Sequence, residues 1–219
     1  MGFLSRHGII ASQTKAKVAP VYVGNAFSTG KTIALPTHQA GDLLVCAATG
    51  YFNGSVISVT PPGWTMLLNN IATDIGVLLY KVAASSSETC AFTASSTWAT
   101  GNIAFCIRGA KAATPINVSA IDASFVTTTT PTAPTVTTTA GSVAVLNIVM
   151  DYDALNNRVS SIVNANLTAL TEISDGGNSD GGCRASFGVK GAAGVVGTTV
   201  FNSVSMGTPF RATLAINPL

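Results

Sequence analysis

The segment of residues 24–32 is the first candidate for chemistry, because it looks like a loop that binds phosphate. Such a loop has four residues between its two glycines, whereas five residues lie between Gly24 and Gly30. No helical pattern follows before Pro36 to supply amide donors and a helix dipole. The spacing therefore predicts a turn between two strands, and it predicts no nucleotide cofactor.

Two histidines are the next candidates, because histidine is the common general base near neutral pH. His7 and His38 are far apart in the sequence, and neither has a nearby Ser or Cys in a recognised nucleophile motif. Residues 37–42 look like a turn before an apolar strand. A surface turn is therefore the expected role of His38. No set of residues at workable spacing predicts an enzyme.

Two acidic pairs could bind calcium through oxygen ligands or act as the paired acids of a glycoside hydrolase. Asp151 and Asp153 form one pair, and Asp175 and Asp180 form the other within a run of glycines. The second pair lacks the ligand spacing and distal Glu of a helix-loop-helix calcium site. Glycine and Asn also make ordinary long loops, so we expect no metal ligand and no catalytic residue here.

Aromatic side chains are candidates for carbohydrate contact, since a flat ring can stack on a sugar. The residues concerned are Tyr51, Phe52, Trp98 and Tyr152. Trp64 follows Pro-Pro-Gly and begins an alternating pattern, which favours an anchor at the edge of the core. Aromatic residues in β-sandwiches are more often core residues, so carbohydrate binding is the secondary interpretation.

Four cysteines, Cys46, Cys90, Cys106 and Cys183, show neither a CxxC motif nor metal-ligand spacing with histidine. The first three lie in strand-like runs, where a free thiol behaves as a small buried hydrophobic group. We expect buried free thiols and assembly in a reducing cytoplasm. The alternative is a disulfide, for which Cys46 and Cys106 on adjacent strands are the candidates.

The composition limits the partners of the chain. Hydrophobic residues make up 47% of the 219 residues and charged residues only 9%, so Ser, Thr, Asn, Gly or neighbouring subunits must cover the surface. The formal net charge of +2 includes no basic cluster, which argues against a nucleic-acid partner. No apolar run approaches the roughly 20 residues that cross a bilayer, so no membrane contact is expected.

Short apolar or alternating runs bounded by Gly, Pro, Asn or Ser predict an all-β chain. Four of these runs in the first half have counterparts in the second half. The pairs are residues 41–45 with 141–145, 63–67 with 166–170, 76–81 with 185–190, and 103–108 with 212–217. Each half therefore repeats one pattern of about four strands.

The duplication predicts a β-sandwich of jelly-roll-like type, built from two quasi-equivalent halves that bury their apolar faces against each other. The expected bounds are an extended N-terminal anchoring arm, 1–18, and one sandwich, 19–219. Within the sandwich, half one is 19–126, a Thr-rich crossover is 127–139, and half two is 140–219. Pro131 and Pro134 place the crossover at an edge or in a linker. Two separate domains are the alternative.

Several strand-and-turn motifs carry a resemblance to a known group of proteins. They are Gly41-Asp42-Leu43-Leu44-Val45, Thr60-Pro61-Pro62-Gly63-Trp64-Thr65, Leu79-Tyr80-Lys81-Val82-Ala83, Ile107-Arg108-Gly109-Ala110 and Thr114-Pro115-Ile116. Their order resembles jelly-roll-like β-sandwich proteins of phages and bacterial surfaces, from about Val21 to the C-terminus. The resemblance implies a structural role with no catalytic residues.

Residues 3–12 carry a second resemblance, to short leaders that precede unrelated β-domains in phage structural proteins. That resemblance implies an attachment tag in which Phe3, Leu4, Arg6, Ile9 and Ile10 anchor the chain to a partner. It also favours a bacteriophage particle over a bacterial surface.

The energetics of this arm point to a partner as well. Burying its four large apolar side chains is worth roughly 6 to 12 kcal/mol. Fixing a dozen backbone residues costs about 12 to 24 kcal/mol. We therefore expect the arm to become ordered only where a partner backbone also pairs with it.

These observations lead us to expect a non-enzymatic accessory protein of a bacteriophage virion, assembled in the host cytoplasm. Capsid decoration, as a cement protein attached through the arm, is the favoured placement. A tail-associated or tail-fibre receptor-binding module that binds host carbohydrate is the alternative. The expected partners are other virion proteins of the capsid or tail, and copies of the chain itself as a homo-oligomer, with a homotrimer favoured.

Overall fold

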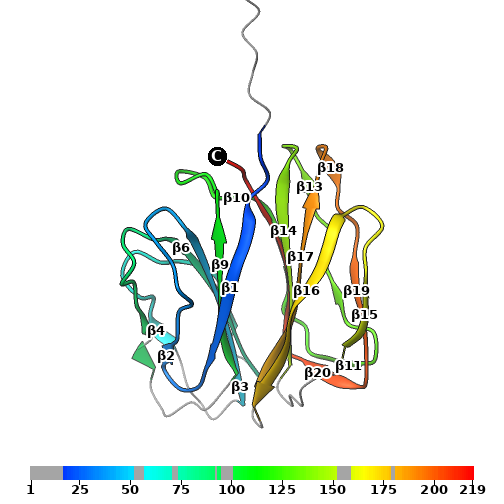
Figure 1. Cartoon of the computed structure of the whole chain (residues 1–219). Coiled ribbons are helices and arrows are strands. Elements are labelled where there is room, and N and C mark those ends of the chain that lie inside the picture. Colours follow the sequence, from blue (N-terminus) through cyan, green and yellow to red (C-terminus); the bar gives the residue numbers. More distant parts are fainter. Residues whose placement is uncertain are drawn as a thin grey trace, which may run out of the picture.

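The computed structural model describes residues 17–51, 57–70, 74–91, 93–94, 101–151, 159–178 and 181–219. Two five-stranded antiparallel sheets face each other (Figure 1). The first sheet has the order β1 (Val21–Ser28), β9 (Asn102–Arg108), β3 (Leu43–Tyr51), β6 (Asp74–Val82) and β5 (Thr65–Asn70). The second has the order β10 (Ile116–Asp122), β21 (Arg211–Ile216), β14 (Val143–Asp151), β17 (Gly181–Lys190) and β16 (Thr168–Asn178).

In the described part of the chain, eleven short strands form smaller ladders outside these sheets. In the first half they are β2 (Thr32–Ile33) with β7 (Cys90–Ala91), and β4 (Ile57–Val59) with β8 (Thr93–Ala94). In the second half they are β11 (Val126–Thr128) with β20 (Met206–Thr208), β12 (Thr132–Ala133) and β15 (Val159–Val163) with β19 (Thr199–Ser203), and β13 (Thr137–Thr138) with β18 (Gly194–Val195). No helix occurs in the described ranges, so the all-β prediction is confirmed.

The two sheets have the same strand order when each strand is matched to its counterpart in the other half. β1, β3, β5, β6 and β9 correspond to β10, β14, β16, β17 and β21. A β-bulge recurs at the same place, between Tyr22 and Gly24 in β1 and between Ile116 and Val118 in β10. The predicted internal duplication is therefore visible in topology and in a local irregularity, with five long strands in each half where about four were expected.

The predicted pair of residues 76–81 with 185–190 is out of register by two residues, because Leu43 pairs with Val82 whereas its counterpart Ala144 pairs with Val189. The predicted pair of residues 41–45 with 141–145 is misaligned by a single residue. Leu43 lies in the core between the sheets, whereas Val143 faces the opposite side of its sheet. The backbone shows the true correspondence, because the left-handed residue before the strand is Gly41 (φ 89°) in one half and Ser142 (φ 56°) in the other. Side chains alternate between the faces of a strand, so an offset of one residue exchanges inside and outside.

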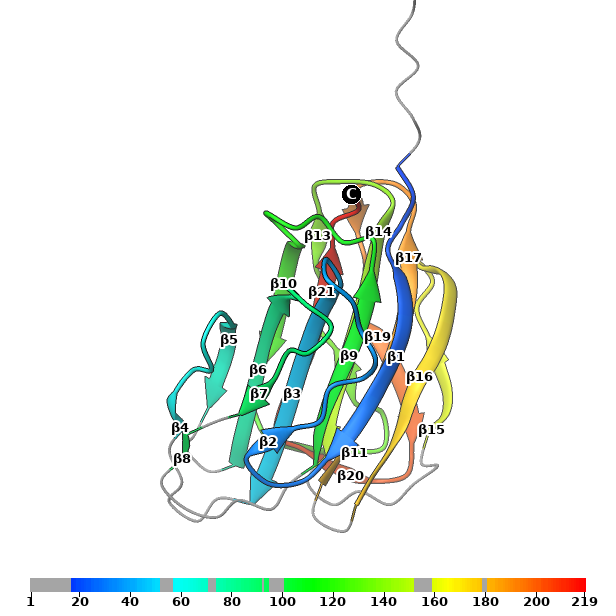
Figure 2. The same ribbon diagram turned by 60° about the vertical axis from the view of Figure 1, so that its left-hand side comes forward.

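The main core lies between the two sheets. Buried apolar residues from both sheets belong to one cluster, whose largest members include Phe105, Phe187 and Phe210. β1 of the first sheet also lies beside β16 of the second, where Asn25 Nδ2 donates a hydrogen bond to the Ile173 carbonyl at 2.8 Å (Figure 2). The outer segments cover the remaining faces, so both sides of the central strands β3 and β14 are buried. This explains why their sequences are continuous apolar runs.

The Thr-rich stretch forms part of the outer cover of the second sheet. Its three short strands pair with segments between Gly194 and Thr208. Ala133 and Val136 from this stretch pack against the outer side chains of β14. β12, which lies between Pro131 and Pro134, is an edge strand of its three-stranded sheet, as the prolines require.

Candidate protein-binding site

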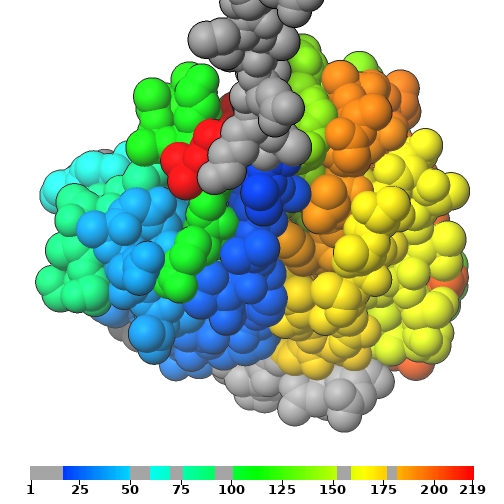
Figure 3. Space-filling model, turned by 45° about the horizontal axis from the view of Figure 1, so that its top comes forward, coloured from blue at the N-terminus to red at the C-terminus, as the bar shows by residue number. Residues whose placement is uncertain are grey.

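The end of the sandwich nearest Lys17 is closed by a short pairing between the two halves. Ala110 and Pro218 form an antiparallel bridge. Leu219 N donates to the Gly109 carbonyl and Lys111 N to the Asn217 carbonyl, each at 3.0 Å. Figure 3, turned to bring this end forward, shows the blue start of β1 and the red C-terminal segment close together. We call this the arm-proximal end.

A surface pocket of about 360 Å³ opens at the arm-proximal end. Its lining residues are Lys17, Val18, Ala19, Val21, Arg108, Gly109 and Leu219. The apolar side chains here are unusually exposed for their type: Val18 at 74%, Val21 at 53% and Leu219 at 77%. The volume falls at the lower end of the roughly 300–1,000 Å³ typical of ligand pockets. We call this group of residues the arm-root pocket.

The corresponding place in the second half has different contacts. There Asn217, which follows β21, donates from Nδ2 to the Thr114 carbonyl and from its backbone N to the Pro115 carbonyl, both at 2.8 Å. These bonds hold the segment that enters β10. In the first half the residue after Ile107 is Arg108, and its guanidinium turns to Asp42 instead. The arm-root pocket therefore lies where the two halves differ.

The Arg108–Asp42 pair is a bidentate ion pair at the pocket wall. Nε and Nη2 of Arg108 each donate to a different carboxylate oxygen of Asp42 at 2.8 Å. The Asp42 carboxyl is buried, and Arg108 lowers its pKa. Burial and the neighbouring Asp42 raise the pKa of the Cys106 thiol to about 12. The pair fixes the position of the guanidinium, while burial is the main reason that the thiol stays protonated.

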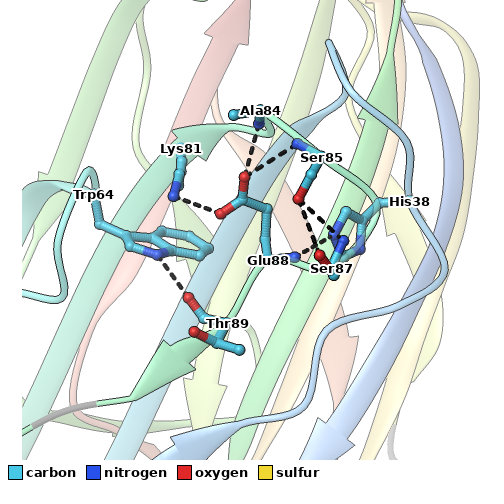
Figure 4. A network of polar contacts seen from close by, with 8 residues as sticks. All are labelled: His38, Trp64, Lys81, Ala84, Ser85, Ser87, Glu88 and Thr89. Atoms are coloured by element: carbon cyan, nitrogen blue, oxygen red, sulfur yellow. Dashed lines mark hydrogen bonds and ion pairs between the residues drawn. The ribbon is translucent and has the colours of Figure 1, made fainter.

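A second polar network lies on the outer side of the first sheet, around Glu88 (Figure 4). The Glu88 carboxylate accepts from Lys81 Nζ at 2.5 Å and from the backbone N of Ala84 at 2.7 Å. His38 Nδ1 lies 2.7 Å from the Pro36 carbonyl, and His38 Nε2 accepts from Glu88 N at 3.3 Å. Both ring nitrogens thus contact backbone atoms, so His38 connects the segment around Pro36 to the loop that contains Glu88. His38 is buried, so its predicted surface exposure is wrong.

The aspartates considered as calcium ligands have a different role where the structure describes them. Asp151 and Asp175 flank the fully buried guanidinium of Arg184, with Nε of Arg184 2.6 Å from Asp175 and Nη2 3.7 Å from Asp151. Asp175 also accepts from Val159 N at 2.9 Å. An arginine cation therefore occupies the space between these carboxylates. Asp153 and Asp180 lie outside the described residues.

Of the candidate carbohydrate contacts, Tyr51 lies at the opposite end of the sandwich. β3 and β14 start near the arm-proximal end and run away from it, so Tyr51 and Asp151 end them at the far end. Phe52, Trp98 and Tyr152 lie outside the described residues. Trp64 is buried, and its Nε1 donates to the Thr89 carbonyl at 3.0 Å, so its prediction as an anchor at the core edge is confirmed (Figure 4).

The five arm residues proposed as anchors, Phe3, Leu4, Arg6, Ile9 and Ile10, also lie outside the described residues. The arm-root pocket was not predicted from the sequence. One signal was available: Val18, Val21 and Val23 are three β-branched apolar residues directly after the arm. The role of Arg108 and Leu219 depends on contacts across the sheet and between the halves, which no local pattern reveals.

All four cysteines are buried and carry free thiols. Within the described part of the chain, no three His, Cys, Asp or Glu side chains gather in a way that could hold a metal ion. The same part contains no helix of the length and apolarity that a membrane crossing requires. Comparison with protein-family models, with curated proteins and with solved structures found no match to this chain.

Proposed function

We propose that this chain is a non-enzymatic structural protein of a bacteriophage particle, an accessory capsid-decoration (cement) protein that attaches through its N-terminal arm. The observation that carries the proposal is the arm-root pocket. Exposed apolar side chains gather at the point where the anchoring segment joins the sandwich. Contiguous exposed apolar surface on a protein is characteristic of an interaction site.

The use of the charged groups supports a binding role rather than a chemical one. Asp42, Glu88, Asp122 and Asp175 each face an Arg or Lys of the same chain. Such pairs fix loops and strands to one another and leave the charge-poor exterior for contact with other proteins. The sandwich then serves as a rigid body that presents the arm.

Attachment can be tested by changing the arm without touching the sandwich. Phe3→Asp with Leu4→Asp should reduce incorporation into particles at least ten-fold, because a partner groove that buries these side chains would have to desolvate two carboxylates. A matched variant, Val163→Asp with Val195→Asp, changes two exposed apolar residues of the second half and should leave incorporation unchanged. Copies per purified particle, counted by quantitative mass spectrometry, give the result. Equal incorporation of both variants would exclude attachment through the arm.

A carbohydrate-binding module of a tail or tail fibre is the second candidate function, and one observation favours it. β3, β14 and the β16–β17 hairpin all end at the far end of the sandwich, at Tyr51, Asp151 and Asn178. Loops that cluster at one end of a sandwich are a common place for recognition. A glycan array with the whole chain tests this function. Binding that is lost in Tyr51→Ala and Trp98→Ala would support it, and an array without signal would exclude it for the glycans displayed.

A further inference from the structure

We propose that the arm-root pocket receives residues 8–14 of a second copy of this chain, with Ile9 and Ile10 in the pocket. This inference rests on the proposed function and adds a partner to it. Residues 3–6 would remain for the particle, while Ile9 and Ile10 would join neighbouring copies. The decorating subunits would then hold one another as well as the shell.

The character of the pocket matches that of the segment. Val18, Val21 and Leu219 supply apolar surface, and the Arg108 charge at the wall is already paired with Asp42. Residues 8–14, Gly-Ile-Ile-Ala-Ser-Gln-Thr, contain no ionisable side chain and carry two large branched apolar residues. The segment therefore brings no unpaired charge into the pocket. By contrast, Arg6 and Lys15 flank it on either side.

The position and reach of the segment also fit. The described chain begins at Lys17, on the rim of the pocket, and Ile10 lies seven residues before it. Seven extended residues span at most about 25 Å. Two copies that approach with their arm-proximal ends together are therefore within reach of each other's pockets.

The sequence between the segment and the pocket favours a second copy over the same copy. To fill its own pocket, the chain would have to reverse direction within residues 11–16 and return to Lys17. Residues 11–16, Ala-Ser-Gln-Thr-Lys-Ala, contain no Gly, Pro, Asn or Asp, and Ser12 is the one residue among them of the types that dominate tight turns. An extended path into a neighbour needs no such turn.

The two halves also differ in the side-chain contacts made at this end. In the second half, Asn217 binds the carbonyls of Thr114 and Pro115, which lie just before β10. In the first half, the Arg108 side chain at the corresponding position is committed to Asp42, and the pocket lies between it and the start of β1.

The first test is the oligomeric state of the full chain by sedimentation velocity. We expect self-association that is weakened at least ten-fold by Ile9→Asp with Ile10→Asp, and equally by Val18→Glu, which changes the pocket outside any strand. The matched control is Val163→Glu in β15, whose parent side chain is 54% exposed and lies in the second half. Circular dichroism melts of all variants verify folding. A monomeric parent chain, or equal association of pocket and control variants, would overturn the proposal.

The second test uses a labelled synthetic peptide of residues 1–16 and the full-length Ile9→Asp, Ile10→Asp protein. Fluorescence anisotropy should show binding that is lost when the protein also carries Val18→Glu, and lost when the peptide carries the two Asp substitutions. Peptide binding to the Ile9→Asp, Ile10→Asp protein but not to a parent chain that stays monomeric would show the segment in its own pocket and would contradict exchange between copies. A variant that loses self-association but is still incorporated into particles would show that the contact between copies is separate from attachment to the shell. A variant that self-associates normally but is not incorporated would show the same separation from the other side.

Discussion

Arg184 is the largest fully buried side chain among the described residues, and it lies between two carboxylates. Burying a guanidinium is tolerated only where charge and hydrogen bonds compensate it. Asp151 and Asp175 supply that compensation at the far end of β14 and β16. These three ionisable groups hold strands together, and removal of any one of them should lower the stability of the protein.

Replacing Arg184 with Met keeps an extended side chain but leaves the two buried carboxylates without their cation. We expect Arg184→Met to lower the free energy of unfolding by about 3–5 kcal/mol. Adding Asp151→Asn and Asp175→Asn should restore part of that loss, because the uncompensated charge disappears. Urea denaturation measures both. A triple variant no more stable than the single one would show that packing, not charge, sets the cost.

The ion pair of Glu88 should make the stability of the folded protein depend on pH. The bond from Lys81 lowers the pKa of the Glu88 carboxyl in the folded state. Its contribution to stability is therefore complete above its unfolded pKa of about 4.3 and is lost as the pH falls through the lower folded value. Glu88→Gln should destabilise the protein at neutral pH by about 1–3 kcal/mol and have less effect in acid.

The pKa of Glu172 is shifted in the opposite direction to that of Glu88. Burial and the nearby Asp175 raise the pKa of its carboxyl. Its charged form is disfavoured in the folded state, so Glu172→Gln should stabilise the protein at neutral pH and lose this advantage below about pH 4. Thermal melts of both variants from acid to neutral pH measure the two trends. Parallel curves for Glu88→Gln and Glu172→Gln would contradict the assignment.

The entry to β3 and β14 shows what the sequence could predict at the scale of elements. Strand runs, tight turns and the match of residues 103–108 with 212–217 follow from apolar alternation and glycine, both of which act locally. The pair 41–45 with 141–145 fails because Gly141 looks like the counterpart of Gly41, whereas Ser142 adopts its left-handed conformation. The arm-root pocket could not be predicted, since Arg108, Val21 and Leu219 meet only through pairing between distant strands.

Gly41 and Ser142, the left-handed residues before β3 and β14, lead to a prediction about backbone strain. Ser142 has φ 56°, a region that glycine occupies without steric cost, so Ser142→Gly should stabilise the protein by about 1 kcal/mol. Gly41→Ala should destabilise it by about 1–2 kcal/mol from its φ of 89° alone, because an added Cβ would meet no heavy atom within 4 Å. Urea midpoints of the two variants test this pair. Opposite signs are expected, and equal signs would contradict the argument.

The shared core sets the behaviour of the whole molecule. Phe105 of the first sheet and Leu214 of the second belong to one apolar cluster, so neither half can bury its inner face alone. Expressed separately, residues 1–110 and residues 111–219 should each fail to show a cooperative unfolding transition. Expressed together, they should copurify and melt as one unit. A cooperative transition for either fragment alone would favour two independent domains.

The equivalent bulges in β1 and β10 carry an implication about ancestry. A polypeptide with a single repeat would expose the apolar inner face of its sheet, and two such polypeptides, the twins, would bury these faces in a symmetric dimer. The segments that lead into the first strand, here called the entrances, would then be identical in both copies. Fusion of the twins into one gene would free each entrance to diverge. The two entrances now differ, because Asn217 binds Thr114 at one and Arg108 binds Asp42 at the other, and the molecule has a single polarity.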